Sequence, residues 1–347
     1  MKRIDFIDVF KGIGIFFVIL GHMPIKSELF SYVFSFQLSI FFFVGGFLYR
    51  DAHYINSFWD YVSKKFRSII IPYIIFSIVS MIIYILYSDY LGKEYDILDI
   101  VWSILISKRN EIYINVPLWF LTSFFTVEIL YYILKCFFNN YVISFIILVF
   151  GFIGVVIFRT TGSLNTLPFS FDASLYFIIY YFIGDLFGGI NKYSNRDYKY
   201  FFRNLSPIFI VSIIVNVMNL LGKIKHADII YYDFGFIIAL ISYLFHVFIS
   251  LTGVCTYLYL SYIFRWVGII KFVGRNSIYY FAFHMPLYQI LYNEGIFDTL
   301  IGNYLTYDIN LNLIGIIYSI IIILILTMPV LLINLYKSLI YKIKTSI

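Results

Sequence analysis

Long apolar stretches follow one another along this chain, separated by short polar segments. An apolar run of about 20 residues is long enough to cross a bilayer as a helix. Ten segments have this character, at residues 6–23, 30–49, 69–88, 117–137, 141–159, 173–190, 205–221, 234–264, 276–293 and 311–335. The pattern predicts an all-α fold, a polytopic transmembrane helical bundle of about ten spans in a single integral membrane domain over residues 1–347.

The eighth segment is long for one crossing and short for two, and the basic residues decide how it is counted. If it crosses once, most of the 25 Lys and Arg residues lie on one side, which the positive-inside rule identifies as cytoplasmic. Two crossings would place Arg265, Lys271 and Arg275 on the outer side. We therefore predict that both termini are cytoplasmic and that residues 229–245 form a kinked or partly re-entrant stretch.

Composition supports a membrane protein and excludes several other classes. Hydrophobic residues make up 62% of the chain and charged residues only 13%, with a mean hydropathy of +0.89. A soluble domain has about 25% charged residues. Cys136 and Cys255 are far apart in apolar runs, so they indicate neither a disulfide scaffold nor a zinc site. The net charge of +6 is explained by topology, and we predict no nucleic-acid partner and no metal.

Lys11 and His22, a cation and an imidazole eleven residues apart, lie within the first apolar segment. Eleven helical steps return to within about 20° of the starting direction and advance about 16 Å, so both side chains share one face. Ionisable groups inside a membrane usually mark a functional site. The alternative is a lysine that extends to the cytoplasmic surface and a histidine at the far rim.

Three further candidates lie in later segments. Glu128 falls near the middle of its span and must be paired, protonated or exposed to a water-filled cavity, where it could orient a histidine. His284 lies at the centre of the ninth segment, with Pro286 just beyond, and either lines a functional site or satisfies a buried polar network. Trp119 is either a residue of the interfacial aromatic belt or part of a binding surface.

Three blocks are spread along the chain: RIDFIDVFKGIGIFFVILGH at residues 3–22, PLWFLTSFFTVE at 117–128 and FVGRNSIYYFAFHMPL at 272–287. In this order and spacing they resemble the acyltransferase-three family of integral membrane O-acyltransferases. Members similar to this chain, without an attached hydrolase-like domain, acylate sugars of surface polysaccharides and other exported glycans. The resemblance implies acyl-CoA as the donor substrate on the cytoplasmic side, no bound cofactor, and a multi-pass protein of the cytoplasmic (inner) membrane.

The resemblance also assigns roles to the first segment. The family's basic residue, followed by ten positions and a histidine, falls on Lys11 and His22. His22 is then the catalytic candidate, either as a base for a sugar hydroxyl or as an acceptor of the acyl group itself. Lys11 would contact CoA phosphates or fix charge near the thioester. Asp8, three residues earlier, would hold Lys11 in an intrahelical pair, which is also a purely structural explanation of both residues.

Two other positions depart from the family pattern. The family's pair of basic residues at the cytoplasmic end of the third segment falls on the basic cluster Lys64, Lys65 and Arg67, of which Lys64 and Arg67 match the pair. Clustered cations there suit CoA phosphates and equally anionic lipid headgroups. Lys64 replaces an arginine, which makes bidentate phosphate binding less assured at that position. Gln37 replaces a histidine of sugar-acetylating relatives and can hydrogen-bond a hydroxyl but cannot titrate, or it bonds a neighbouring helix.

The residues and the resemblance together predict an acyl-CoA-dependent O-acyltransferase that moves an acyl group to a hydroxyl of a cell-surface or lipid-linked glycan. We expect the acyl group to be acetyl. The predicted site comprises catalytic His22 and Lys11, acyl-CoA-binding Lys64 and Arg67, and acceptor-site or supporting Asp8, Gln37, Trp119, Glu128 and His284. The main alternative is a glycan or organic-acid transporter of the inner membrane, although matched internal repeats are not evident. An inactive relative acting as a scaffold is a third hypothesis, which the retention of Lys11 and His22 opposes.

Overall fold

The computed structural model describes residues 3–49, 57–91, 96–109, 111–112, 114–161, 167–193, 198–224, 236–301 and 311–346. Its regular elements there are helices. The first half comprises α1 (Asp5–Gly21), α2 (Ser27–Phe34), α3 (Gln37–Phe47), α4 (Phe58–Lys65), the π-helix η2 (Phe66–Ile70), α5 (Ile71–Leu91), α6 (Ile97–Ile106), the 3-10 helix η3 (Val116–Leu118), α7 (Trp119–Phe137) and α8 (Asn140–Thr161). The second comprises the 3-10 helix η4 (Pro168–Ser170), α9 (Phe171–Tyr193), α10 (Tyr198–Asn204), α11 (Ser206–Leu220), α12 (Phe236–Ile263), α13 (Gly268–Arg275), α14 (Ser277–Asn293), α15 (Ile296–Ile301) and α16 (Leu311–Ser346).

Six helical segments of the described chain are long and apolar enough to cross a membrane, or seven if the bent pair α10 and α11 forms one span. The six are Ser27–Phe47, Phe58–Tyr87, Val116–Phe137, Pro168–Ile190, Leu240–Ile263 and Leu311–Ser338. Helices α1 and α14 have 17 residues each, just below that length. The predicted all-α bundle is confirmed for the described residues, whereas the ten spans and the cytoplasmic termini stay predictions.

The eighth apolar segment forms a single helix. Helix α12 runs from Phe236 to Ile263 in 28 residues. Of the predicted kinked stretch at 229–245, the first seven residues lie outside the described chain, and the remainder is the continuous start of α12. A regular helix satisfies all of its interior backbone groups without a break, which favours it in an apolar environment.

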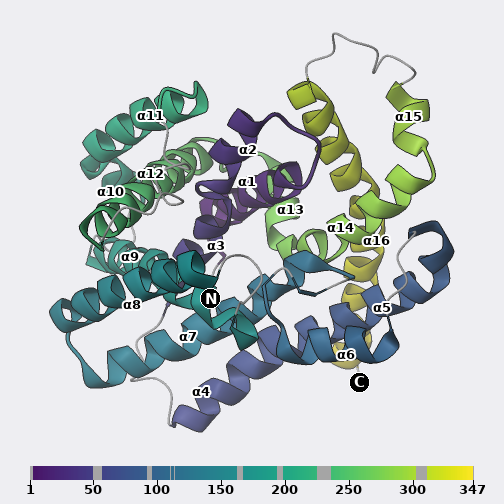
Figure 1. Cartoon of the computed structure of the whole chain (residues 1–347), viewed down its shortest axis with the longest axis horizontal. Coiled ribbons are helices and arrows are strands. Elements are labelled where there is room, and N and C mark those ends of the chain that lie inside the picture. Colours follow the sequence, from purple (N-terminus) through teal and green to yellow (C-terminus); the bar gives the residue numbers. More distant parts are fainter. Residues whose placement is uncertain are drawn as a thin grey trace.

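Helix α1 lies in the middle of the bundle (Figure 1). It packs against α2, α3, α12, α13, α14 and α16. Its side chains are apolar on nearly all sides, and Phe6, Val9, Phe10 and Ile15 are almost completely buried. A helix that is apolar all round is stable only when other elements cover every face. The first apolar segment therefore brings Lys11 and His22 to the centre of the fold.

The outer helices expose apolar stripes. On α5, Ile71, Ile75, Ile78, Ile82 and Leu86 recur every three or four residues, and each is 41–71% exposed. Such a continuous apolar face would be unstable in water but suits contact with lipid chains. The opposite face of α5 is buried, with Tyr73, Phe76 and Tyr84 in the core. The stripe identifies the lipid-facing side of this helix.

Helices α3 and α9 approach each other closely because α9 carries glycine at the contact. A Cβ atom added to Gly184 would collide with the backbone carbonyl of Phe43 on α3. At Gly189, one and a half turns further along α9, an added Cβ would meet nothing within 4 Å. Small residues permit this kind of backbone contact between membrane helices. The register of α3, which begins at Gln37, therefore depends on Gly184.

We expect Gly184→Val to destabilise the protein and Gly189→Val to be tolerated. The first substitution forces α3 and α9 apart, at a cost of about 1–3 kcal/mol for overpacking. The second adds the same side chain to the same helix in open space. The thermal unfolding midpoint in detergent should fall by several degrees for Gly184→Val only. Equal midpoints for the two variants would show that the close contact contributes nothing to stability.

Candidate active site

Two cavities open along one side of α1. The larger, of about 450 Å³, is lined in part by Lys11 and Ile15, and the smaller, of about 260 Å³, by Val18 and His22. These residues follow one another at intervals of four, three and four, so they form one face of the helix. The predicted alignment of Lys11 and His22 is confirmed, with each residue at a different cavity.

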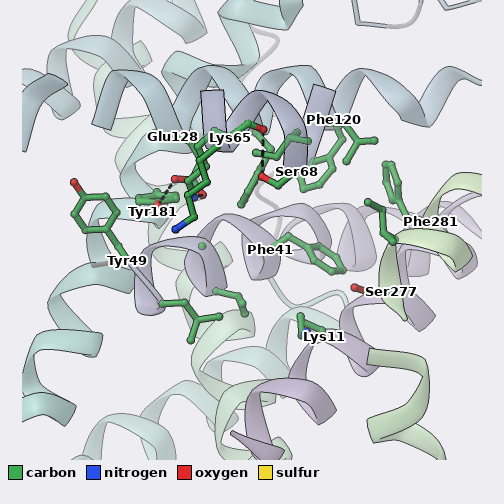
Figure 2. A pocket seen from close by; sticks show the side chains of 18 of the residues that line it. Lys11, Phe41, Tyr49, Lys65, Ser68, Phe120, Glu128, Tyr181, Ser277 and Phe281 are labelled. Atoms are coloured by element: carbon green, nitrogen blue, oxygen red, sulfur yellow. Dashed lines mark hydrogen bonds and ion pairs between the residues drawn. The ribbon is translucent and has the colours of Figure 1, made fainter. Parts of the chain in front are cut away.

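We call the larger space the cation cavity, because Lys11, Lys64 and Lys65 line it. Figure 2 shows Lys11 on one side and Lys65 with Glu128 on the other, with Phe120 and Phe281 towards one end. Most of the remaining wall is apolar. Lysine ammonium groups around an apolar hollow suit an elongated ligand with phosphates at one end.

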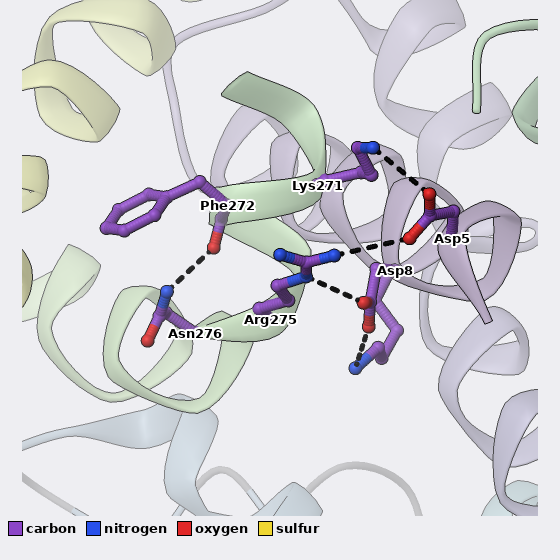
Figure 3. Close-up of polar contacts among 7 residues, drawn as sticks. Asp5, Asp8, Lys271, Phe272, Arg275 and Asn276 are labelled. Carbon is purple, nitrogen blue, oxygen red and sulfur yellow. Dashed lines mark hydrogen bonds and ion pairs between the residues drawn. The ribbon is translucent and has the colours of Figure 1, made fainter. Parts of the chain in front are cut away.

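Asp8 holds Lys11 in place. Its carboxylate Oδ1 lies 3.2 Å from the Lys11 ammonium, which confirms the predicted intrahelical pair. The other oxygen accepts a hydrogen bond of 2.9 Å from Nε of Arg275 at the end of α13, and Arg275 also pairs with Asp5 (Figure 3). A carboxylate that is almost completely buried needs such partners. Asp8 thus joins α1 to α13 and orients Lys11 beside the cavity.

Glu128 is paired in the same way. One carboxylate oxygen lies 2.7 Å from the ammonium of Lys65, while Tyr61 and Tyr181 donate hydrogen bonds of 2.6 and 2.8 Å to the other (Figure 2). Glu128 is only 3% exposed, so these partners compensate for the loss of water. Of the three predicted states, the paired one is found. The partners of Glu128 are Lys65, Tyr61 and Tyr181, rather than the histidine that the sequence suggested.

The two predicted donor-binding residues are placed differently. Lys64 lines the cation cavity, whereas Arg67 is not among the residues of its wall and is exposed on η2. Lys65, next to Lys64, occupies the wall instead. Both lysines lie at the end of α4, whereas Arg67 belongs to the π-helix η2 that follows it. The sequence places Lys65 in a basic cluster, but no local pattern predicts its contact with Glu128.

We call the smaller space the histidine cavity, after His22. Gln37 of α3 and Trp119 of α7 line it as well, so three predicted residues meet there, with His22 at the C-terminal cap of α1. Trp119 is 9% exposed, which places it in the cavity wall within the bundle. Its wall also includes residues that the sequence did not single out for this site, among them Arg109, Tyr176 and His246. Arg109 forms an ion pair of 3.0 Å with Asp172, so the cation is neutralised.

His284 lies next to His22. The centroids of the two imidazole rings are 5.2 Å apart, with an angle of 43° between the ring planes. His284 is fully buried, and its Nδ1 lies 2.7 Å from the backbone oxygen of Phe281. His22 and His284 come from opposite ends of the chain, and the packing of α1 against α14 brings them together.

The described residues hold no cluster of three or more His, Cys, Asp or Glu side chains placed to bind a metal ion. The side chains at and beside the two cavities include the imidazoles of His22, His246 and His284, the lysines of the cation cavity, and neutral hydrogen-bonding groups such as Gln37. These can bind phosphates, orient a hydroxyl and transfer a proton.

A family model described as an acyltransferase domain matches residues 4–333, nearly the whole chain. The chain therefore belongs to the acyltransferase-three family. It is a multi-pass membrane protein of the acyltransferase class, in agreement with its apolar helices. No curated protein and no solved structure gives a significant match.

The pair of Lys65 and Glu128 predicts a non-additive effect on stability. Lys65→Met or Glu128→Leu alone leaves one charge without its partner and should lower the free energy of unfolding by about 2–3 kcal/mol. The double variant removes both charges and should recover most of that loss, because Tyr61 and Tyr181 donate to the same oxygen and can then bond each other. Thermal unfolding of the four proteins in one detergent measures this. Additive losses would contradict the pairing.

Proposed function

We propose that this protein transfers an acyl group from acyl-CoA to a hydroxyl of a cell-surface or lipid-linked glycan in the cytoplasmic membrane. The acyl group that we propose is acetyl. The observation that carries the proposal is the arrangement of two chemically different cavities along one face of α1. Family membership supplies the reaction class. The substrates are inferred from the side chains that line each cavity.

The cation cavity suits the donor. CoA is an elongated molecule with phosphates at one end and a thioester at the other. Lys64 and Lys65 lie on one wall and Lys11 on another, in a hollow that is otherwise largely apolar. Ammonium groups bind phosphates by charge-assisted hydrogen bonds, while an apolar wall accommodates the uncharged arm. Of the three lysines, Lys11 is the one on α1, the helix that leads to the histidine cavity. Lys11 would therefore lie towards the thioester end of CoA.

The histidine cavity suits a neutral, hydroxyl-rich acceptor. Trp119, Tyr176 and Phe177 provide aromatic surfaces, and Gln37 provides an amide whose Oε1 has no hydrogen-bond partner in the described structure. Amides bond sugar hydroxyls, and aromatic rings pack against the apolar faces of sugars. The pairing of Arg109 with Asp172 leaves little net charge to attract an anionic glycan. His22 lines this cavity and would meet the hydroxyl.

Phe120 and Phe281 line both cavities. Their ring centroids are 5.2 Å apart, so this aromatic pair forms the boundary between the two spaces. The thioester carbonyl and the acceptor hydroxyl would therefore meet beside Phe281, which lies three residues before His284. Holding two reactants at such a boundary removes most of the entropic cost of bringing them together.

The reaction needs no further reactant. The hydroxyl oxygen attacks the thioester carbonyl, the carbon–sulfur bond breaks, and the hydroxyl proton passes through a base to the departing sulfur. The products are an oxygen ester and CoA with a free thiol. Proton transfer by an imidazole at this position would contribute roughly 10²–10⁴-fold to the rate.

The first test is acyl transfer by the purified protein in lipid nanodiscs, with labelled acetyl-CoA and a pool of lipid-linked and cell-envelope glycans. We expect label to reach glycan with the wild type and to fall by at least about 10²-fold with His22→Gln. His246→Gln, which removes a second imidazole from the wall of the same cavity, should cause a smaller loss. Uptake of glycan without any label transfer, in vesicles containing the protein, would instead favour the transporter.

A second test separates the candidates for donor binding. Lys64→Gln removes a cation from the cavity wall and should raise KM for acetyl-CoA roughly three- to tenfold, with kcat little changed. Arg67→Gln removes a cation of the same charge three residues away and should change KM less, because Arg67 is not part of the wall. A larger effect at Arg67 would show that the donor phosphates lie outside the cation cavity.

A further inference from the structure

The protonation of His284 follows from its contacts. Its Nδ1 lies 2.7 Å from the carbonyl oxygen of Phe281 and 3.2 Å from that of Tyr280. A carbonyl oxygen can only accept a hydrogen bond, so Nδ1 must carry the hydrogen. In a neutral imidazole the other nitrogen then has a lone pair. Nε2 of His284 is therefore a hydrogen-bond acceptor.

That acceptor has no partner in the described structure. His284 is 0% exposed, and Nε2 is a buried atom without a hydrogen bond. Buried polar atoms are nearly always hydrogen-bonded, because leaving one unsatisfied costs free energy. An orphan acceptor beside a proposed active site requires a donor, and the neighbouring ring of His22 can supply one.

The separation of the rings fits such a bond. Two imidazoles joined by an N–H to N hydrogen bond have centroids about 5 Å apart, since roughly 1 Å of each ring flanks a donor–acceptor distance of about 3 Å. The observed separation is 5.2 Å. Only the orientation of the rings has to change for the bond to form. Hydrogen bonds in empty active sites are often poorly aligned and tighten when substrate binds.

We propose that His284 is a positioning residue that selects the reactive form of His22. In the complex with substrates, Nε2 of His284 accepts a hydrogen bond from one ring nitrogen of His22. The other nitrogen of His22 then carries the lone pair and faces the histidine cavity. This inference rests on the proposed function and names the group that prepares its base.

The geometry also stabilises the charge that the reaction creates on His22. When the free nitrogen takes the proton of the acceptor hydroxyl, His22 becomes an imidazolium, and its bond to His284 strengthens. His22 follows the last turn of α1, where the backbone carbonyls present the negative end of the helix dipole. The proton then passes to the sulfur of the departing CoA, and both rings return to their neutral forms. A neutral acceptor such as His284 adds no second charge to an apolar interior.

Residues outside α14 stabilise the turn of this helix that contains His284. Pro286 lacks the N–H that would bond the carbonyl of Ala282. Asn115, just before η3, donates a hydrogen bond of 2.8 Å to that carbonyl and a second, of 2.9 Å, to Ser80 on α5. Asn115 and Ser80, both distant in sequence from α14, thus hold the backbone two residues before His284, as a positioning role requires.

Two amide substitutions at residue 284 separate the roles of the two ring nitrogens. In His284→Asn the amide can still donate to the Phe281 carbonyl but is too short to reach His22. In His284→Gln the amide oxygen can reach His22 and accept its hydrogen bond, while the bond to Phe281 is lost. A purely structural role predicts that the asparagine variant is the more active. The positioning role predicts the opposite order.

We expect kcat for acetyl transfer to fall about 10–100-fold in His284→Asn and to stay within a few-fold of the wild type in His284→Gln, with KM for acetyl-CoA similar in all three. The tautomer of His22 is read directly from two-bond ¹H–¹⁵N correlations of ¹⁵N-histidine-labelled protein in nanodiscs, assigned with His22→Gln. A CoA thioether analogue and a glycan fraction are added to fill the site. One neutral tautomer should dominate in the wild type and His284→Gln, and two should coexist in His284→Asn.

The outcomes separate this inference from the proposed function. A single His22 tautomer that is unchanged in His284→Asn, or an asparagine variant at least as active as the glutamine variant, overturns the positioning role. If acyl transfer needs His22 but not His284, the proposed function stands and this inference fails. If the wild type transfers no acyl group but the tautomer depends on residue 284, the hydrogen bond stands and the acyltransferase proposal fails. Should His284→Asn not yield monodisperse protein, His284→Leu replaces it with the same expected loss.

Discussion

Charge placed among apolar helices must be paired, and this constraint organises the whole site. Asp8 bridges Lys11 and Arg275, and thereby ties α1 to α13. Glu128 bridges Lys65 and two tyrosines, and thereby ties α7 to α4 and α9. In each case a buried carboxylate fixes the direction of a lysine at the edge of the cation cavity. The pairs that stabilise the bundle are therefore the same ones that place its cations.

The two cavities offer different physical environments along one face of α1. One offers positive charge and apolar surface, and the other offers neutral hydrogen-bonding groups and aromatic rings. Phe120 and Phe281 form their common wall, and the two histidines lie just beyond Phe281. Under the proposed function, a polar donor and a polar acceptor approach through separate spaces and meet only where a base is available.

Some of this site could be predicted from local sequence and some could not. The helical period placed Lys11 and His22 on one face, and the three-residue spacing placed Asp8 beside Lys11; both were correct. Lys64, Lys65 and Arg67 belong to one basic cluster in the sequence, but only the two lysines at the end of α4 line the cation cavity. Arg109, Tyr176 and His246 lie on segments that gave no local indication of a shared cavity.

The sequence by itself determined the class of the fold, because hydropathy and helical periodicity are properties of neighbouring residues. It also determined that ionisable groups on α1, α7 and α14 would need partners. Burying an unpaired ionisable group among apolar residues costs free energy wherever the group lies. Only the tertiary structure decided which partners they have. Lys65 meets Glu128, and His22 meets His284, across separations of 63 and 262 residues in the chain. Such contacts depend on how helices pack against one another, for example through Gly184, and no local pattern specifies that packing.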